Sequence, residues 1–460
     1  MSYYSLETKK YILLFGDIII LYASLYLTLL LRYRTDPLDG HWGSHFWPFT
    51  AIFFLWLVIF YISNLYDLTT AINNAKFYSL TAKALFFAFL LGTTFFYLNP
   101  QLNIAPKRNL LIDIVVTAAL FLVWRQLFNK TLKSYLPQNK VAIIGFNEQT
   151  KELIKYFNDN PHLGLKISFI LSSQDIYEKG LYNVKHFKDI SKIKECLSQE
   201  NISTVILTDD VHASDEIRSS LFNCINLGIN FVSLPHFYEK ITGRVPVESI
   251  NQMWFLENLH EGGKLWFDKL KRLYDIIMAF FILAVTGLFW LIIAAVIKIE
   301  SRGPVFYRQE RIGKGNKIIY LIKFRSMVEE GNSRRPTVPN DPRVTNFGRF
   351  LRKTRADEIP QVINIIKGEM SIIGPRPERP ELAERLQAEI PFYNERSLVL
   401  PGISGWDQVC GEYHSPSKED TIKKLQYDLY YIKNRSLFLD LVIILKTVRT
   451  VLLGREASNS

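Results

Sequence analysis

The sequence predicts three parts: a membrane region of four α-helices, a small α/β domain with a doubly wound parallel sheet, and an α-rich α/β domain with its own membrane hairpin. Three observations predict this order. Four apolar runs occupy residues 11–127, strand-like and helix-like segments alternate from about residue 139, and a fifth apolar run has cations on both flanks. The expected boundaries are 1–135, 139–245 and 264–460, with a linker at 246–263.

The composition limits the classes of protein to which the chain can belong. It has 460 residues, a formal charge of +11, 48% hydrophobic residues and 14% aromatic residues. A basic nucleic-acid-binding protein rarely contains so much Phe and Leu, so we expect no nucleic-acid partner. The composition instead favours a membrane protein with its cations on the cytoplasmic side. Cys196, Cys224 and Cys410 are scattered, and their spacing predicts neither disulfides nor a zinc site.

Each of the first four runs is long enough to cross a hydrocarbon core of ~30 Å. Cations at both ends of the region, such as Lys9 and Lys130, place both ends in the cytoplasm. Asp17 and Asp113 lie inside spans, where an ionisable group is either functional or part of a polar contact between helices. The runs are Tyr11–Leu31, Phe46–Leu65, Leu80–Leu98 and Leu110–Leu127.

The next segment predicts a Rossmann-like domain. The strand-like stretches "KVAIIGF", "LKISFIL", "STVILT" and "INFVSLP" alternate with helical stretches at about 149–158, 189–199 and 214–227. A dinucleotide site would need G-x-G-x-x-G after the first strand, but only Gly145 is present there. Phe146 would crowd a pyrophosphate and Glu148 would repel it. We therefore favour a degenerate Rossmann-like domain that serves packing or dimerisation.

The fifth apolar run, Ile276–Ile297, is flanked on both sides by lysines and arginines. A re-entrant hairpin over about 273–299 would keep both flanks in the cytoplasm, whereas a plain fifth crossing is the alternative. Gly287 is a weak candidate for the break in the hairpin. Near the end, "SLFLDLVIILKTVRTVLLG" predicts an apolar helix that either lies in the membrane interface or packs in a protein core.

The stretch "LRKTRADEIPQVINIIKGEMSIIGPRPE" (351–378) carries two adjacent carboxylates among several arginines. Asp357 is expected to be the N-cap of a helix whose first turn holds Glu358 and Pro360, and which stops at Gly368. A structural interpretation is complete in itself: Asp357 caps the helix and Glu358 complements the helix dipole.

The functional interpretation assigns different roles to the two carboxylates, because neighbouring helical positions point about 100° apart. A helix N-terminus among arginines favours phosphate, and nearby cations keep carboxylates ionised at neutral pH. Ionised Asp357 could attack phosphorus while Glu358 holds Mg²⁺. Pro375 and Pro377 would fix Arg376, and "YLIKFRSM" would present Lys323 and Arg325 on one face of a strand. A stiff loop and a solvated strand face are the structural alternatives.

Several stretches together resemble the monotopic phosphoglycosyl transferases, also called bacterial sugar transferases or polyprenyl glycosylphosphotransferases. They are "KLKRLYDII", "GPVFYRQERIG", "KFRSM", "NDPRVTNFGRFLRKTRADEIPQVINIIKGEMSIIGPRPE", "LPGISGWDQV" and "KLQYDLYYIKNRSLFLDL". The resemblance covers about 264–455. The four helices and the Rossmann-like domain before it are similar to the long form of this family, whose members start O-antigen, capsule or exopolysaccharide synthesis.

The resemblance implies transfer of a sugar-1-phosphate from a UDP-sugar to undecaprenyl phosphate, with release of UMP. Asp357 would attack the β-phosphate and form a phosphosugar-aspartyl intermediate, and Glu358 would help to hold Mg²⁺. The Arg352 and Arg376 guanidinium groups would contact phosphate. The Gly-Pro-Arg-Pro turn with Pro375 and Pro377 would help to hold the nucleotide, with Lys323 and Arg325 as supporting cations.

The resemblance also implies a multi-pass protein of the bacterial inner (cytoplasmic) membrane, with the catalytic and Rossmann-like domains facing the cytoplasm. Its partners would be the UDP-sugar, the lipid acceptor, the bilayer and, by analogy, a second copy in a homodimer. The chain departs from the family pattern at Leu400, Asp407 and Glu412, and Gly287-Leu288 replaces a Ser-Pro pair. A glycosyltransferase that releases UDP, and a non-catalytic membrane scaffold or nucleotide sensor, are the competing hypotheses.

Overall fold

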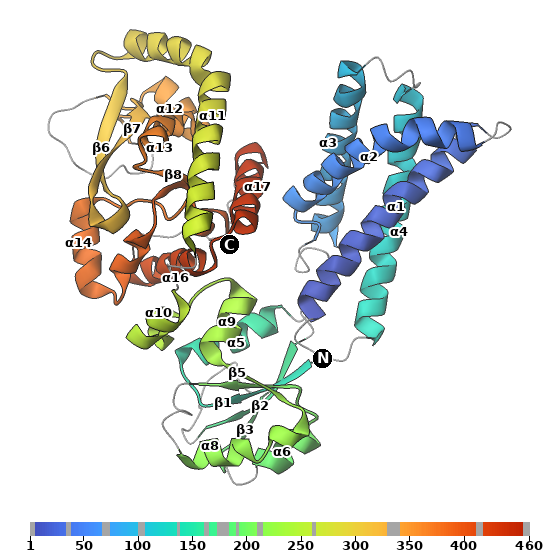
Figure 1. Cartoon of the computed structure of the whole chain (residues 1–460), viewed down its shortest axis with the longest axis vertical. Coiled ribbons are helices and arrows are strands. Elements are labelled where there is room, and N and C mark those ends of the chain that lie inside the picture. The colour runs from blue at the N-terminus through green and yellow to red at the C-terminus, as the bar shows by residue number, and fades with distance from the viewer. Residues whose placement is uncertain are drawn as a thin grey trace. The chain divides into compact units, whose positions relative to one another are not determined.

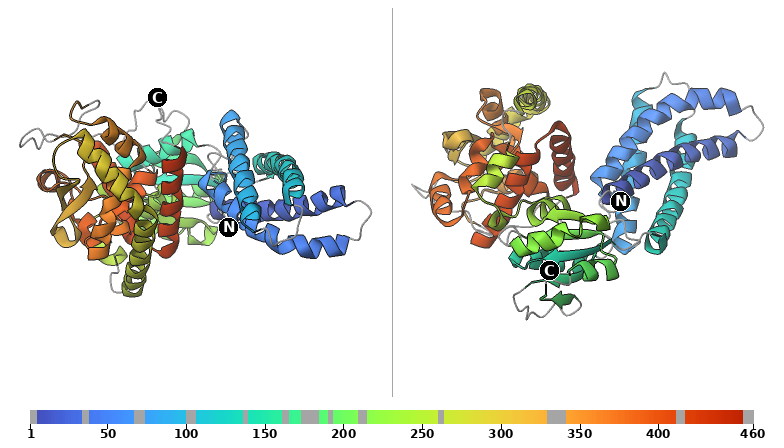
Figure 2. Two further views of the ribbon diagram at one scale, coloured as in Figure 1. Left: turned by 90° about the horizontal axis from the view of Figure 1, so that it is seen from above. Right: turned by 60° about the horizontal axis from the view of Figure 1, so that its bottom comes forward.

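A computed structural model describes residues 5–33, 38–66, 74–99, 106–135, 139–160, 165–172, 184–189, 193–208, 215–259, 264–328, 341–410 and 417–453. The chain divides into two compact units, Met1–Leu234 and Pro235–Ser460, which are treated separately below. Figure 1 shows the elements of both units, and Figure 2 shows them from two further directions.

The first unit begins with four long helices, which confirms the prediction of four apolar helices. They are α1 (Ser5–Arg32), α2 (Leu38–Ile62), α3 (Ala75–Leu98) and α4 (Pro106–Tyr135). Each contains a stretch long and apolar enough to cross a membrane. Aromatic side chains such as Phe49, Trp56 and Phe121 are buried between the helices, and the Trp56 indole donates a hydrogen bond to the Ala88 carbonyl at 2.8 Å.

Both intramembrane aspartates lie in contacts between α1 and α4. The Asp17 carboxylate accepts a hydrogen bond from the Arg125 guanidinium at 2.8 Å, and both side chains are buried. Asp113 Oδ1 accepts hydrogen bonds from the hydroxyls of Ser24 at 2.8 Å and Thr28 at 3.4 Å. Polar groups in an apolar surrounding need such partners, so the geometry favours the interpretation of both aspartates as interhelical contacts.

The first unit ends in a five-stranded sheet whose strands are all parallel, in the order β3-β2-β1-β4-β5. Figure 1 shows helix α5 on one side of this sheet and α6 and α8 on the other. The prediction of a parallel sheet is confirmed, but the three-residue strand β3 was missed. The strands are β1 (Asn139–Ile144), β2 (Leu165–Leu171), β3 (Lys185–Phe187), β4 (Thr204–Leu207) and β5 (Asn230–Ser233). The helices are α5 (Glu148–Asp159), α6 (Ile193–Gln199) and α8 (Asp215–Phe222).

Packing explains the glycine at the end of β1. Gly145 has a φ of +91°, and a Cβ at this position would lie 1.8 Å from the Thr208 hydroxyl oxygen. Two of the amide groups at the start of α5 are engaged in a capping box, because the Asn147 side chain accepts from the Thr150 amide and the Thr150 hydroxyl accepts from the Asn147 amide, both at 2.9 Å. This turn therefore has a structural reason for its sequence that requires no bound phosphate.

In the second unit, the segment that follows the sheet packs against the C-terminal core. Helices α9 (Leu234–Thr242) and α10 (Gln252–Asn258) flank three buried side chains, those of Val245, Val247 and Ile250. The Trp406 indole also donates to the Gly243 carbonyl at 2.9 Å. Part of the expected linker, 246–263, thus contributes to the core of the C-terminal unit.

The fifth apolar run lies in α11 (Leu265–Glu300), a single helix of 36 residues. Gly287 lies within this helix, so the structure does not confirm a hairpin of two helices. Figure 1 shows that α11 is bent, with its last part running across the top of the unit. Its apolar side chains are largely exposed; Leu288, for example, is 74% exposed. Lys271 near its start forms an ion pair with buried Asp440 at 2.7 Å, which fixes the helix to the core.

The last helix, α17 (Leu437–Leu453), uses two faces. Leu439 and Ile443 are buried in the core of the unit, whereas Phe438 is 73% exposed. The predicted packing of this helix in a protein core is therefore present, and the apolar outer face leaves the predicted contact with the membrane interface open.

In its described residues, the rest of the second unit contains two short pairs of strands and several helical elements. Strands β6 (Phe306–Ile312) and β7 (Ile318–Phe324) form an antiparallel pair, and β8 (Ser371–Ile373) pairs in parallel with β9 (Gly402–Ser404). Buried side chains on helix α13 (Val362–Lys367) and on β8, such as Ile365 and Ile373, belong to one core with Leu321 of β7. The helical elements are α12 (Asn346–Thr354), η8 (Ala356–Gln361), α13 (Val362–Lys367), α14 (Pro380–Glu389), η9 (Tyr393–Leu398), α15 (Trp406–Cys410) and α16 (Lys418–Asn434).

Candidate active site

The two adjacent carboxylates lie in the short 3₁₀ helix η8, between α12 and α13. The prediction that Asp357 is an N-cap is wrong: Arg355, with a φ of +56°, holds the cap position, and Asp357 falls in the first turn. Arg355 ends α12 and precedes η8 directly, and its left-handed backbone differs from the extended backbone of a usual N-cap, so its side chain makes no capping hydrogen bond. The predicted stop is confirmed, because α13 ends at Gly368, which has a φ of +84°.

Glu358 is held by two cations from distant parts of the sequence. Its Oε1 accepts hydrogen bonds from Lys323 Nζ of β7 and from Arg376 Nη2 of the loop after β8, both at 2.8 Å. The Glu358 side chain is only 10% exposed. Burial acts to raise the pKa of this carboxyl, but Arg376 and Lys323 outweigh it and hold the pKa well below its usual range. Glu358 is therefore a stable carboxylate.

Asp357 has a different environment. It is partly buried, and among the residues that the structure describes, none donates a side-chain hydrogen bond to its carboxylate. Burial and then the neighbouring Glu358 raise the pKa of Asp357, while Lys323 and Arg352 oppose the rise. One carboxylate is thus fixed by two cations, whereas the other, beside it, accepts no hydrogen bond from the side chain of a described residue.

The remaining predicted cations separate into two groups. Arg352 lies near Asp357 and donates from Nε to the Ser326 hydroxyl at 2.8 Å. Arg325 lies just beyond β7 and donates to the Ser301 carbonyl at 2.8 Å, at the end of α11. The structure brings Lys323, Arg352 and Arg376 to the carboxylates, but it directs Arg325 to the end of α11.

The Gly-Pro-Arg-Pro turn is fixed through its carbonyl groups. Since Pro375 and Pro377 have no amide proton, the turn depends on donors from other elements. The Gly402 amide donates to the Pro375 carbonyl at 3.0 Å, and the Ile312 amide donates to the Glu378 carbonyl at 2.9 Å. The turn is therefore held between β9 and β6.

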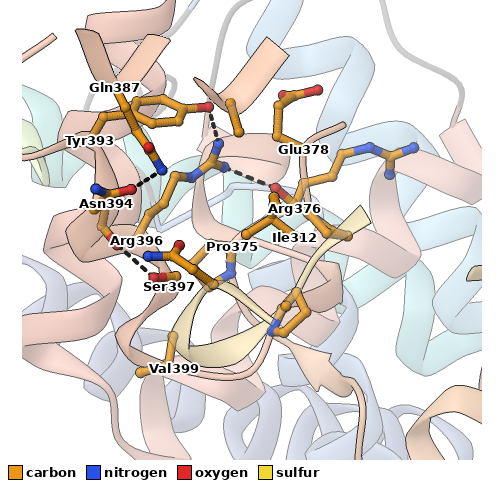
Figure 3. A pocket seen from close by; sticks show the side chains of 15 residues that line it. Ile312, Pro375, Arg376, Glu378, Gln387, Tyr393, Asn394, Arg396, Ser397 and Val399 are labelled. Carbon is orange, nitrogen blue, oxygen red and sulfur yellow. Dashed lines mark hydrogen bonds between the residues drawn. The ribbon is translucent and has the colours of Figure 1, made fainter. Parts of the chain in front are cut away.

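The same turn lines a small cavity, which Figure 3 shows from close by. Behind the turn lies Arg396, which is 9% exposed and was not identified from the sequence. Its guanidinium donates to the Arg376 carbonyl at 2.9 Å and to buried Asp428 at 2.7 Å. These partners are 20 and 32 positions away along the chain, so no local pattern could have indicated them. The cavity is lined by Ile312, Gly313, Asn316, Pro375, Arg376, Pro377, Glu378, Ala383, Gln387, Tyr393, Asn394, Arg396, Ser397, Val399 and Pro401.

One of the sequence departures, Asp407, lies near the ion pair of Arg396 with Asp428. Burial raises the pKa of Asp428 to about 6 in spite of Arg396, and nearby Asp407 adds to the rise. Asp407 is itself buried on α15. Glu412 lies outside the residues that the structure describes.

The residues around the Asp357–Glu358 pair, here called the dyad, suit a divalent cation that is held partly by substrate better than they suit a dedicated metal site. Within the described ranges, no three His, Cys, Asp or Glu side chains cluster as metal ligands. Glu358 Oε1 is occupied by the two cations, whereas Oε2 makes no hydrogen bond to a described residue. Mg²⁺ is commonly bound by one or two carboxylates together with substrate phosphates, and Glu358 Oε2 provides one such ligand.

Comparison with known proteins gives consistent matches. A profile of the family "Bacterial sugar transferase" matches residues 266–454. A UDP-N-acetylgalactosamine-undecaprenyl-phosphate N-acetylgalactosaminephosphotransferase of Aeromonas hydrophila is 40% identical over 54% of this chain and 58% of its own length. A UDP-glucose:undecaprenyl-phosphate glucose-1-phosphate transferase of Klebsiella pneumoniae is 31% identical over 70% of this chain and 69% of its own. The uncharacterized sugar transferase EpsL of Bacillus subtilis is 40% identical over 40% of this chain and 88% of its own.

Proposed function

Because this chain belongs to the bacterial sugar transferase family, we propose that it transfers a sugar-1-phosphate from a UDP-sugar to undecaprenyl phosphate. The names of two similar proteins, from Aeromonas and Klebsiella, give undecaprenyl phosphate as acceptor and UDP-linked sugars as donors. In this reaction the bond between the α–β bridging oxygen and the β-phosphorus breaks. The β-phosphorus ends on an oxygen of the lipid phosphate, and UMP leaves.

The different environments of the two carboxylates support a two-step route. The Asp357 carboxylate accepts no side-chain hydrogen bond from a described residue, so an oxygen lone pair is available for attack on the β-phosphorus. This attack expels UMP and leaves the sugar phosphate on Asp357. An oxygen of the lipid phosphate then attacks the same phosphorus and frees the Asp357 carboxylate.

The cations around the dyad would stabilise the charge that develops on the phosphoryl oxygens. Lys323 and Arg376 already share Glu358 Oε1, and Arg352 is close enough to act on Asp357. Donors held in place beforehand stabilise a transition state without the cost of reorganisation. A Mg²⁺ ion held by Glu358 would neutralise further phosphate charge.

For the membrane arrangement, we propose an inner-membrane protein whose catalytic and Rossmann-like domains face the cytoplasm. Cations precede and follow the exposed apolar part of α11, and the bend in this helix is compatible with entry and exit on one side of the bilayer. The four-helix region and the parallel sheet would be accessory to the chemistry, because the carboxylates and their cations all lie in the second unit.

The experiment that tests the proposal identifies the released nucleotide. Solubilised protein is given a panel of UDP-sugars with Mg²⁺, with and without undecaprenyl phosphate. We expect UMP from at least one donor, a lipid-linked sugar phosphate, and loss of both in Asp357→Asn. Release of UDP would instead indicate glycosyl transfer, and retention of activity in Asp357→Asn would contradict the assigned nucleophile.

A further inference from the structure

Arg396 has three acceptors in a buried site. The Arg396 guanidinium donates to the Tyr393 hydroxyl at 2.6 Å, to Asp428 Oδ2 at 2.7 Å and to the Arg376 carbonyl at 2.9 Å. Figure 3 shows the bonds to Tyr393 and Arg376. Asp428 on α16 is 1% exposed and Tyr393 is 3% exposed. A buried cation with a buried counter-ion and planar, directional donors has one well-defined orientation.

The acceptor on the turn is the backbone of a residue that contacts the dyad. Arg376 presents its carbonyl to Arg396 and its guanidinium to Glu358 Oε1. Pro375 and Pro377 fix the backbone torsions on both sides, so the position of the Arg376 peptide sets the point from which its side chain starts. A shift of the carbonyl is therefore transmitted to the guanidinium.

The donors to the other carbonyls of the turn differ from Arg396 in the element that supports them. The Pro375 and Glu378 carbonyls are held by backbone amides of β9 and β6, and the Pro377 carbonyl accepts from Arg311 at 3.3 Å. The Arg376 carbonyl is held by a side chain whose counter-ion lies on α16. The orientation of Arg376 thus depends on the packing of η9 against α16.

We propose that Arg396, paired with Asp428, is a positioning residue for the transfer reaction and acts through Arg376. The inference rests on the proposed function, since it assigns the support of a cation in that same site. The hydrogen bonds of Arg396 go to Tyr393, Asp428 and the Arg376 carbonyl, so in this proposal its guanidinium does not contact the reacting phosphate. It would fix the Arg376 backbone so that the guanidinium meets Glu358 and the phosphate in one geometry.

Arg396→Lys is the appropriate variant, because lysine keeps a positive charge for Asp428 but lacks the planar fork that reaches three acceptors at once. We expect it to lower kcat/KM for the UDP-sugar about 10- to 100-fold, as small misplacements of a catalytic group do. In an Arg376→Ala background the same change should alter kcat/KM less than about threefold, since the group it positions is gone.

Arg435→Lys serves as the matched control. Arg435 is also a buried arginine in the second unit, with a side chain 1% exposed, but it pairs with Asp268 of α11. Its effect on kcat/KM should be the same factor in both backgrounds. If Arg396→Lys likewise lowers kcat/KM by the same factor in both backgrounds, Arg396 acts on general stability and the proposal is wrong.

Amide hydrogen exchange provides a readout that does not depend on turnover. In Arg396→Lys the amides of Gly402 and Ile312, which donate to the Pro375 and Glu378 carbonyls of the turn, should exchange about tenfold faster than in wild type, because a charged hydrogen bond that holds the turn is lost. The control variant should leave them unchanged. Unaltered exchange at these amides would overturn the proposal. Failure of the wild type to release UMP from any donor would count against the proposed function, and the exchange result would still decide whether Arg396 holds the turn.

Discussion

Replacing Glu358 by glutamine tests the charge arrangement at the centre of the site. The substitution keeps the shape of the side chain but removes the charge that Lys323 and Arg376 share. The Lys323 and Glu358 side chains are 16% and 10% exposed, so solvent screens this pair little. Removing one partner of a buried ion pair typically costs 3–5 kcal/mol. Because the Arg376 side chain is 38% exposed, solvent weakens its ion pair with Glu358. We therefore expect Glu358→Gln to lower the free energy of unfolding by about 3 kcal/mol, the low end of that range.

For a unit of this size, such a loss lowers the melting temperature by about 6–12 °C. The assay is thermal unfolding of the full chain in detergent or nanodiscs at neutral pH. Asp357→Asn is the matched control, because it makes the same kind of substitution at the adjacent position. The folded protein raises the pKa of Asp357 and so disfavours its charge at neutral pH. Removal of that charge should leave the melting temperature equal or higher.

The two variants should thus differ in stability while both lose turnover. We expect Asp357→Asn to lose at least about 1000-fold in kcat, as removal of a nucleophile does. A melting temperature for Glu358→Gln within about 2 °C of wild type would refute the energetic argument. An equal fall in melting temperature for Asp357→Asn would show that the two carboxylates do not differ as described.

Three further predictions concern neighbouring groups. Although burial acts to raise it, Lys424 and Arg396 lower the pKa of Glu378 to about 2, so its stabilisation is present above pH ~4.5 and is lost as the pH falls toward 2. The loss should reach about 3 kcal/mol, and Glu378→Gln should flatten a melting curve taken against pH. Arg325→Gln should lower the melting temperature and change kcat/KM little, because Arg325 holds Ser301 at the end of α11. A loss of kcat/KM with an unchanged melting temperature would contradict this. Chelation of Mg²⁺ by EDTA should abolish turnover and leave thermal stability within about 1 °C, because the described residues form no cluster of three metal ligands that would hold the ion as part of the fold; unchanged turnover in EDTA would count against a metal.

Features that depend on neighbouring residues could be predicted from the sequence. The four membrane helices follow from apolar runs long enough to span a bilayer. Four of the five parallel strands follow from short apolar stretches between turn signals, whereas the three-residue β3 is too short for a pattern. The end of α13 at Gly368 follows from the freedom of glycine at positive φ. The Asp-Glu pair and the two prolines around Arg376 also stand out as local patterns.

Only the tertiary structure determined how these groups are used. The sequence placed Lys323 and Arg325 on one face, but Lys323 meets Glu358 from 35 positions away and Arg325 turns to Ser301. The sequence also predicted that Asp357 caps a helix, but left-handed Arg355 occupies the position before η8 and Asp357 lies in its first turn. Arg396 was not identified from the sequence, and Asp428 lay in a stretch that resembles the family but was given no role of its own. Hydrogen bonds and ion pairs between distant segments exist only once the chain has closed its loops, so the sequence determines which charges are available and the packing determines which of them meet.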